Sequence, residues 1–146
     1  MKWFLVCSVL ALASIASTTA MAVDKEAVKK DMEQLQGEWS MLMPDGSGKT
    51  ISDSKRVCKG DETTVTFGGR LMMKARFTID PSKKPKTIDY QMIDGPTKGK
   101  KQLGIYELNG DTVKFCFGSP GSERPSDFTS KPGDGRTLSV WKREKK

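Results

Sequence analysis

The sequence contains no histidine, and this absence excludes the catalytic arrangements that depend on one. A Ser-His-Asp triad and a Cys-His pair both use an imidazole as the base. The commonest zinc ligand is missing too, and two cysteines, Cys58 and Cys116, do not make a typical zinc site without histidine. No other catalytic or cofactor motif is recognisable. We therefore expect a protein that is not an enzyme and that has no cofactor.

Long apolar runs are also scarce, since the only one extends from residue 3 to about residue 15. Lys2 precedes it and an A-x-A cleavage signature follows at positions 20–22, a combination typical of a secretory signal peptide. A retained membrane anchor is the alternative, but the run is shorter than the ~20 residues that a spanning helix needs. We therefore expect residues 1–22 to be a signal peptide. Residues 23–146 would form one periplasmic or extracellular domain with no membrane span.

Cysteine is rare, with Cys7 in the predicted signal peptide and only Cys58 and Cys116 after it. Export permits these two to form a disulfide, but the sequence does not show that their Cα atoms come within reach of each other. The alternative is a pair of buried thiols that pack as small apolar side chains. Both alternatives remain open at this point.

Acidic residues are fewer than basic ones, 18 against 25. One lysine falls in the predicted signal peptide, so the mature chain has a net charge of +6. The cations concentrate at 83–86, 97–101 and 141–146. Such runs can attract anionic polymers, but more often they are solvated loops and strand ends that discourage edge pairing. Because the chain is expected to be exported, we expect no nucleic-acid partner.

The segment "DKEAVKKDMEQL" predicts one short amphipathic helix. Val28, Met32 and Leu35 lie at helical spacing, and Asp24 is a suitable N-cap. Gly37 ends the helical pattern.

After this glycine the apolar period changes from 3.6 to 2, which indicates half-buried strands. In the last of these segments Leu138 and Val140 share one face. Short connections such as Gly60-Asp61 imply that sequential strands pair antiparallel, and closure of the sheet removes exposed edges. The sequence predicts an all-β fold, an up-and-down antiparallel barrel of about eight strands with one short N-terminal helix, and a monomer. The expected strands are "EWSMLM", "RVCK", "TTVTF", "LMMKARFTI", "TIDYQM", "LGIYEL", "TVKFCF" and "RTLSVWK".

The Gly-x-Trp at Gly37 and Trp39 predicts how the barrel is closed at one end. Glycine lets the helix turn tightly into the first strand, and the large ring plugs the opening. This order resembles the lipocalin pattern, in which a cation near the last strand stacks over the tryptophan. Parity with the apolar positions of the last strand favours Lys142 for that role, whereas the better stacking of a guanidinium on aromatics favours Arg143.

Several longer segments resemble a family of small, mostly exported domains expanded in planctomycete bacteria. They are "LQGEW", "GDETTVTFGG", "FTIDPSKKPKTIDY", "GPTKGKKQLGIYELNGDTVKFCF" and "PGSERPSDFTSKPGDGRTLSVWKREKK". The resemblance implies the domain and its compartment, but the family has no established function and supplies no catalytic or ligand residues. "MPDGSGKTISDSKRV" is shorter than the usual connection, and Cys58 stands where the family commonly has another small residue, which counts against the disulfide.

Two binding hypotheses follow. In the first, the barrel holds a small apolar or amphipathic ligand, because an eight-stranded barrel has room for side chains or for one small ligand. Its candidate lining is Phe67, Phe77, Tyr90, Tyr106 and Phe115, with core packing as the alternative role. Tyr106 has the opposite parity from Ile105, which argues against an inward position for Tyr106. In the second, the loop at 118–135 and the basic runs bind another protein or an anionic envelope polymer.

Overall fold

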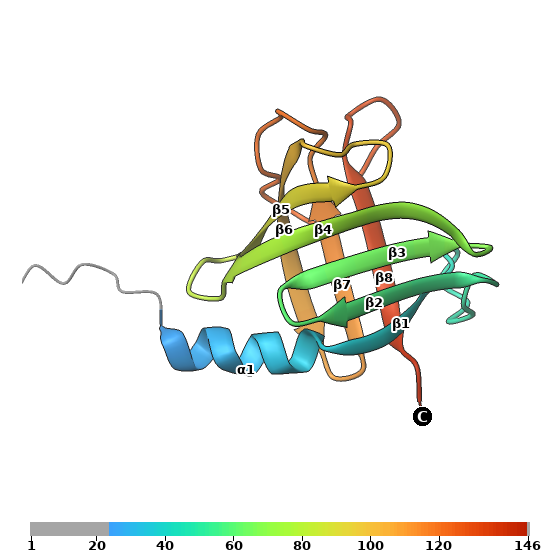
Figure 1. The fold of residues 1–146 in the computed structure, drawn as a ribbon, viewed down its shortest axis with the longest axis horizontal. Helices are drawn as coiled ribbons and strands as arrows, with labels where there is room; N and C mark the ends of the chain where they lie inside the picture. Colours follow the sequence, from blue (N-terminus) through green and yellow to red (C-terminus); the bar gives the residue numbers. More distant parts are fainter. Residues whose placement is uncertain (1–23, 146) are drawn as a thin grey trace, which may run out of the picture.

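The computed structural model describes residues 24–145, which form one helix and a closed antiparallel barrel (Figure 1). Each strand pairs with the next and β8 pairs with β1, so the sheet has no free edge. The predicted all-β up-and-down barrel of eight strands with one short helix is confirmed. The predicted signal peptide and Cys7 lie outside the described residues. The elements are α1 (Lys25–Leu35), β1 (Gly37–Met41), β2 (Ser54–Lys59), β3 (Glu62–Phe67), β4 (Arg70–Asp80), β5 (Lys86–Asp94), β6 (Lys101–Asn109), β7 (Thr112–Phe117) and β8 (Thr137–Arg143).

Helix α1 begins and ends as the sequence predicts. The carboxylate of Asp24 accepts hydrogen bonds from backbone N–H groups of the first turn, at 3.1 and 3.4 Å. After Leu35, the side chain of Gln36 bonds both backbone groups of Gly60 in the β2–β3 turn. Gly37 then has φ +112°, a conformation that glycine adopts readily, and it leads directly into β1. Within residues 24–145, no helix has the length and apolar character required to cross a membrane.

The connections fix where the two ends of the barrel lie. Two-residue turns join β2 to β3, β3 to β4 and β6 to β7. The longest connection, residues 118–136, runs between β7 and β8 on the side of the barrel away from α1 (Figure 1). Helix α1 therefore lies at the end where β1 starts, and residues 42–53 lie at the end where β1 stops.

The core is the barrel interior, filled by the inward positions of all strands. Its most buried side chains include Trp39, Phe115 and Trp141, each no more than 1% exposed. In β8 the face that carries Leu138 and Val140, which the sequence suggested as the apolar one, does not point into the core. Trp141 and Arg143 occupy the inward face, while Leu138 is 40% exposed on the other. The indole of Trp141 buries more apolar surface than the leucine or the valine would, so it sets the register.

Candidate functional site in the barrel

Trp39 plugs the barrel end next to α1, as predicted. Its ring is 0% exposed and its Nε1 donates a hydrogen bond to the Leu35 carbonyl at 3.1 Å. The guanidinium carbon of Arg143 lies 4.2 Å from the centre of the ring. Arg143 also donates to the Gln36 carbonyl at 2.6 Å and to the Gln34 carbonyl, both at the end of the helix. A cation stacked on the ring therefore also caps the helix C-terminus, where the carbonyls carry partial negative charge.

These contacts show which of the two candidate cations stacks on Trp39. Arg143 performs the stacking, and Lys142 is exposed on the outer face of β8. The parity argument for Lys142 was wrong because Trp141 takes the inward position next to it. A Cβ at Gly37 would lie only 3.2 Å from Nη1 of Arg143, so the glycine also makes room for the guanidinium.

The five predicted lining aromatics belong to the core. Phe77, Tyr90, Tyr106 and Phe115 are at most 3% exposed, and Phe67 is partly buried against them. Phe117, another core aromatic, packs between two of them: its ring centroid lies 4.2 Å from that of Tyr90 and 6.0 Å from that of Phe115. The core alternative is therefore correct for these residues, and they form the packed wall of the interior.

Tyr106 points into the barrel, although its parity is opposite to that of the apolar residue Ile105. The reason is that Ile105 is buried on the outer face of β6, under residues 118–136. Its hydroxyl donates to Oδ2 of the buried Asp31 at 2.7 Å, and Nζ of Lys86 lies 2.8 Å from the same oxygen. Burial first, and then the hydrogen bond to Asp31, raise the pKa of Tyr106 well above its usual range. This group joins α1 to β5 and β6. No sequence pattern indicated this group, since Asp31 is one of many charged residues on its helix.

Arg56 is the most unusual residue of the interior. It is only 4% exposed, and its Nη1 donates to Oγ1 of Thr63 at 3.0 Å and to the hydroxyl of Tyr90 at 2.9 Å. The ring centres of Phe115 and Trp141 lie 4.6 and 4.5 Å from its guanidinium carbon. All four neighbours are neutral. Burial raises the pKa of the Tyr90 phenol, and the positive charge of Arg56 opposes that rise.

Sequence reasoning missed Arg56, although the sequence contains a weak signal for it. Alternation in "SKRVCK" places Lys55, Val57 and Lys59 on one face. Two lysines favour water, so Arg56 and Cys58 fall on the dry face. The signal is weak because each face of this short strand has only one apolar residue, so neither face stands out as the buried one.

An apolar pocket of about 510 Å³ lies where β1 ends and β8 begins. We call it the β1–β8 pocket. The segment after β1 folds back over it, with the Leu42 N–H bonded to the Val140 carbonyl at 2.8 Å. Met43 and Leu138 are each 40% exposed there. Exposed apolar side chains that gather at one place, unlike single scattered ones, mark a candidate binding surface. The lining includes Met41, Met43, Ile51, Leu138, Ser139 and Val140.

Cys58 and Cys116 are both free and buried, so the disulfide alternative is wrong and the thiol alternative is right. Their positions explain this. Cys58 faces the interior with its sulfur 3.4 Å from Oγ1 of Thr63, whereas Cys116 lies beneath the outer loop with its sulfur 3.7 Å from the Thr129 carbonyl. The wall of the barrel separates them. Among residues 24–145 no group of three or more Cys, Asp or Glu side chains is placed to hold a metal ion.

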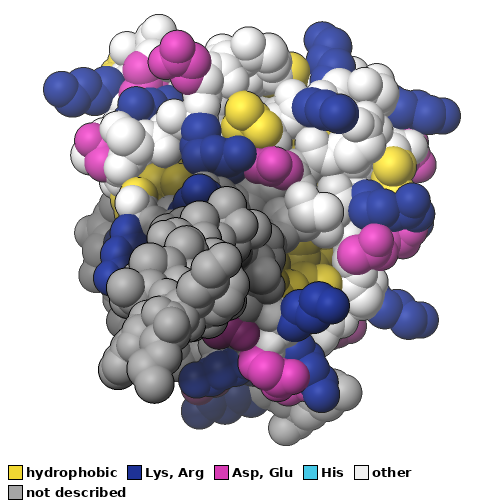
Figure 2. All heavy atoms as spheres, turned by 90° about the vertical axis from the view of Figure 1, so that its left-hand side faces the viewer, with side chains coloured by type: hydrophobic (Ala, Val, Ile, Leu, Met, Phe, Trp, Pro, Cys, Tyr) yellow, Lys and Arg dark blue, Asp and Glu magenta, His cyan; other side chains and the backbone are white. Residues whose placement is uncertain are grey.

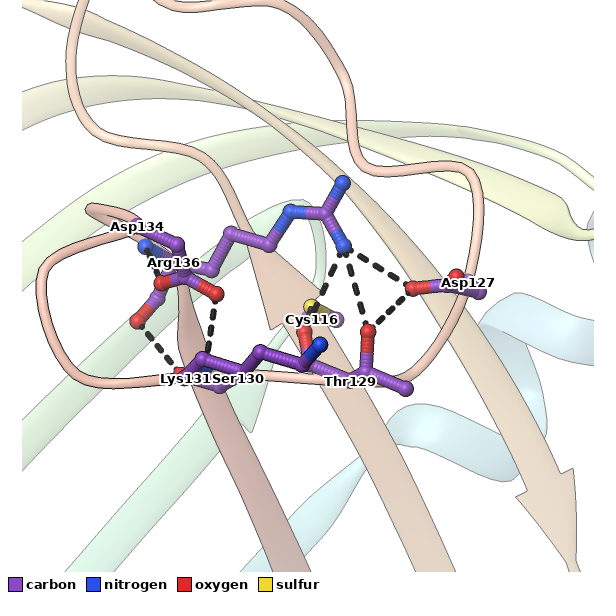
Figure 3. A network of polar contacts seen from close by, with 7 residues as sticks. All are labelled: Cys116, Asp127, Thr129, Ser130, Lys131, Asp134 and Arg136. Atoms are coloured by element: carbon purple, nitrogen blue, oxygen red, sulfur yellow. Dashed lines mark hydrogen bonds and ion pairs between the residues drawn. The ribbon is translucent and has the colours of Figure 1, made fainter.

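The connection 118–136 is held in place by its own polar contacts (Figure 3). Nη1 of Arg136 lies 2.8 Å from the carboxylate of Asp127, and Asp134 accepts the backbone N–H groups of Lys131 and Arg136 at 2.6 and 2.8 Å. Arg124 anchors the other half of the loop. Thus the loop is ordered by contacts that use its own arginines.

On the face of the molecule that Figure 2 shows, the cations of the described residues do not gather into one basic patch. On the part of the molecule visible in Figure 2, Lys and Arg side chains are spread over the surface with Asp and Glu among them. Lys83 and Lys84 line two neighbouring grooves, and no described carboxylate lies within ion-pair distance of either lysine. These two lysines come from the predicted basic run at 83–86.

The closed eight-stranded barrel is compatible with a small binding domain. Comparisons with protein-family models, with curated proteins and with solved structures found no match to this chain.

Proposed function

We propose that the protein is an exported, non-catalytic binding protein for a small apolar or amphipathic ligand. The observation that carries this proposal is the β1–β8 pocket, whose volume lies in the usual range for small-molecule sites and whose lining is mainly apolar. Export rests on the signal-peptide pattern of residues 1–22, and membership of the planctomycete family rests on the sequence resemblance. The packed aromatics of the interior support the site by holding the barrel wall rigid.

The test uses two methionines with nearly equal exposure. Met43 lines the pocket and is 40% exposed, whereas Met72 is 43% exposed outside it. Binding of an uncharged fluorescent naphthylamine probe should weaken about fivefold in Met43→Gln, because roughly 1 kcal/mol of apolar contact is lost. Met72→Gln should bind the probe as the unchanged protein does. Equal affinities in all three proteins, or no binding by any, would contradict the proposal.

A surface-binding function for an anionic polymer is the second candidate, and Lys83 and Lys84 are the observation in its favour. The predicted carrier of that function, the loop at 118–135, fits less well because Arg124 and Arg136 are already paired with Asp89 and Asp127. Binding of an anionic polysaccharide should fall steeply with salt if the lysines carry it. Probe uptake in the β1–β8 pocket should be insensitive to salt.

A further inference from the structure

Arg56 is a buried cation that has no buried anion. Among the described residues no carboxylate lies within ion-pair distance of it, and its contacts are two hydroxyl groups and two aromatic rings. Buried charges in proteins are normally paired, because removing a charge from water is costly. Cation–π contact offsets part of that cost. The rest of the cost would be met by an anion that the chain itself does not supply.

The unused part of the guanidinium has a definite shape. Both hydrogen bonds of Arg56 leave from Nη1, while Nε is buried with no hydrogen-bond partner in the described chain. On a planar guanidinium the N–H of Nε and one N–H of Nη2 point in the same direction. That edge donates two parallel hydrogen bonds to a single carboxylate. Thr63 and Tyr90 hold the opposite end, so the free edge is oriented.

We propose that Arg56 binds the carboxylate of an amphipathic ligand inside the barrel, which makes the ligand a monocarboxylate. This rests on the proposed function, since the apolar part of the same ligand would occupy the β1–β8 pocket. Trp141 connects the two places: its backbone pairs with that of Met41 in the pocket, and its ring contacts the guanidinium. A single negative charge matches a single cation, and the surrounding rings disfavour a second one.

The experiment compares decanoate with decanol by calorimetry on the exported, natively purified protein in about 0.5 M salt, which screens the surface lysines. We expect decanoate to bind about tenfold or more tightly than decanol, as a charged bidentate hydrogen bond allows. Arg56→Met should abolish this preference, so that decanoate binds no more tightly than decanol. Arg76→Met is the matched control, because Arg76 is an exposed arginine paired with Asp61 and Glu62. It should keep the preference.

The possible outcomes separate the two proposals. Equal binding of decanoate and decanol, or a preference that survives in Arg56→Met, overturns the role of Arg56 and leaves the binding function standing. Failure of both compounds to bind overturns the binding function itself. If circular dichroism shows that Arg56→Met does not fold, the proposal is tested on the unchanged protein alone, by measuring its preference for decanoate in high salt. A preference for decanoate that persists in high salt then supports the buried carboxylate site, and its disappearance contradicts it.

Discussion

At the scale of single residues, Arg143 shows how one side chain can join elements from the two ends of the sequence. It stacks on Trp39 of the first strand and donates to carbonyls at the end of α1. Its neighbour Lys142 extends into solvent from the same strand. Substituting each of the two residues in turn therefore distinguishes the effect of the stacked cation from the effect of a positive charge on this strand.

We predict that Arg143→Ala lowers the free energy of unfolding by about 2–3 kcal/mol, from the lost cation–π contact and the lost charged hydrogen bonds. Lys142→Ala should change it by less than about 0.5 kcal/mol, because the side chain is exposed. Urea denaturation followed by tryptophan fluorescence measures both. Similar losses in the two variants would mean that the stacking contributes nothing specific.

At the scale of elements, the connection between β7 and β8 behaves as a folded part of the wall. Nη1 of Arg124 donates to the Gly104 carbonyl at 2.7 Å and to the Ile88 carbonyl at 3.3 Å, and it lies 2.7 Å from a carboxylate oxygen of Asp89. This single side chain fastens the loop over the outer face of β5 and β6. Ile105 is buried beneath it as a consequence.

We expect Arg124→Ala to release this loop while the barrel stays folded. Loss of charged hydrogen bonds at a half-buried site costs about 1–3 kcal/mol, so amide hydrogens of residues 118–136 should exchange about tenfold faster or more. Hydrogen exchange with mass spectrometry measures this segment separately from β2 and β3. Lys131→Ala is the control, since its side chain forms no ion pair or hydrogen bond with a described residue. A uniform rise in exchange across the whole chain would contradict a local role.

At the scale of the whole molecule, the closed barrel buries both tyrosines of the chain. Burial raises the pKa of Tyr90 and of Tyr106 above the ordinary value of 10.0. The unfolded chain would release both phenolic protons near pH 10, whereas the folded chain retains them. The contribution of these groups to stability is therefore complete below about pH 10 and is lost as pH rises further.

A spectrophotometric titration tests this directly. The folded protein should show no phenolate absorbance at about pH 10.5, and unfolding in urea at the same pH should produce it at once. Circular dichroism in parallel confirms that the sample without urea is folded. Tyr106→Phe should halve the absorbance released on unfolding. Phenolate absorbance in the folded protein at this pH would show that the hydroxyl groups reach solvent.

The sequence determined the fold because the fold depends on local patterns. Alternating apolar residues, two-residue turns and an N-capped helix ending at Gly37 each act over a few neighbours, and a meander of such strands closes to satisfy its edges. The plug at Trp39 was predictable for the same reason, since its position follows from the junction of helix and strand.

Only the tertiary structure decided the candidate site. Arg56 is buried because β2 lies opposite aromatic rings from β7 and β8, which are far away along the chain. The choice of Arg143 over Lys142 depended on which face of β8 Trp141 occupies, and the separation of Cys58 from Cys116 depended on the barrel wall. A period-2 pattern assigns residues to two faces but does not say which distant side chains meet across the interior. Closure of the barrel determines which of these side chains meet, and it thereby determines the chemistry of the site.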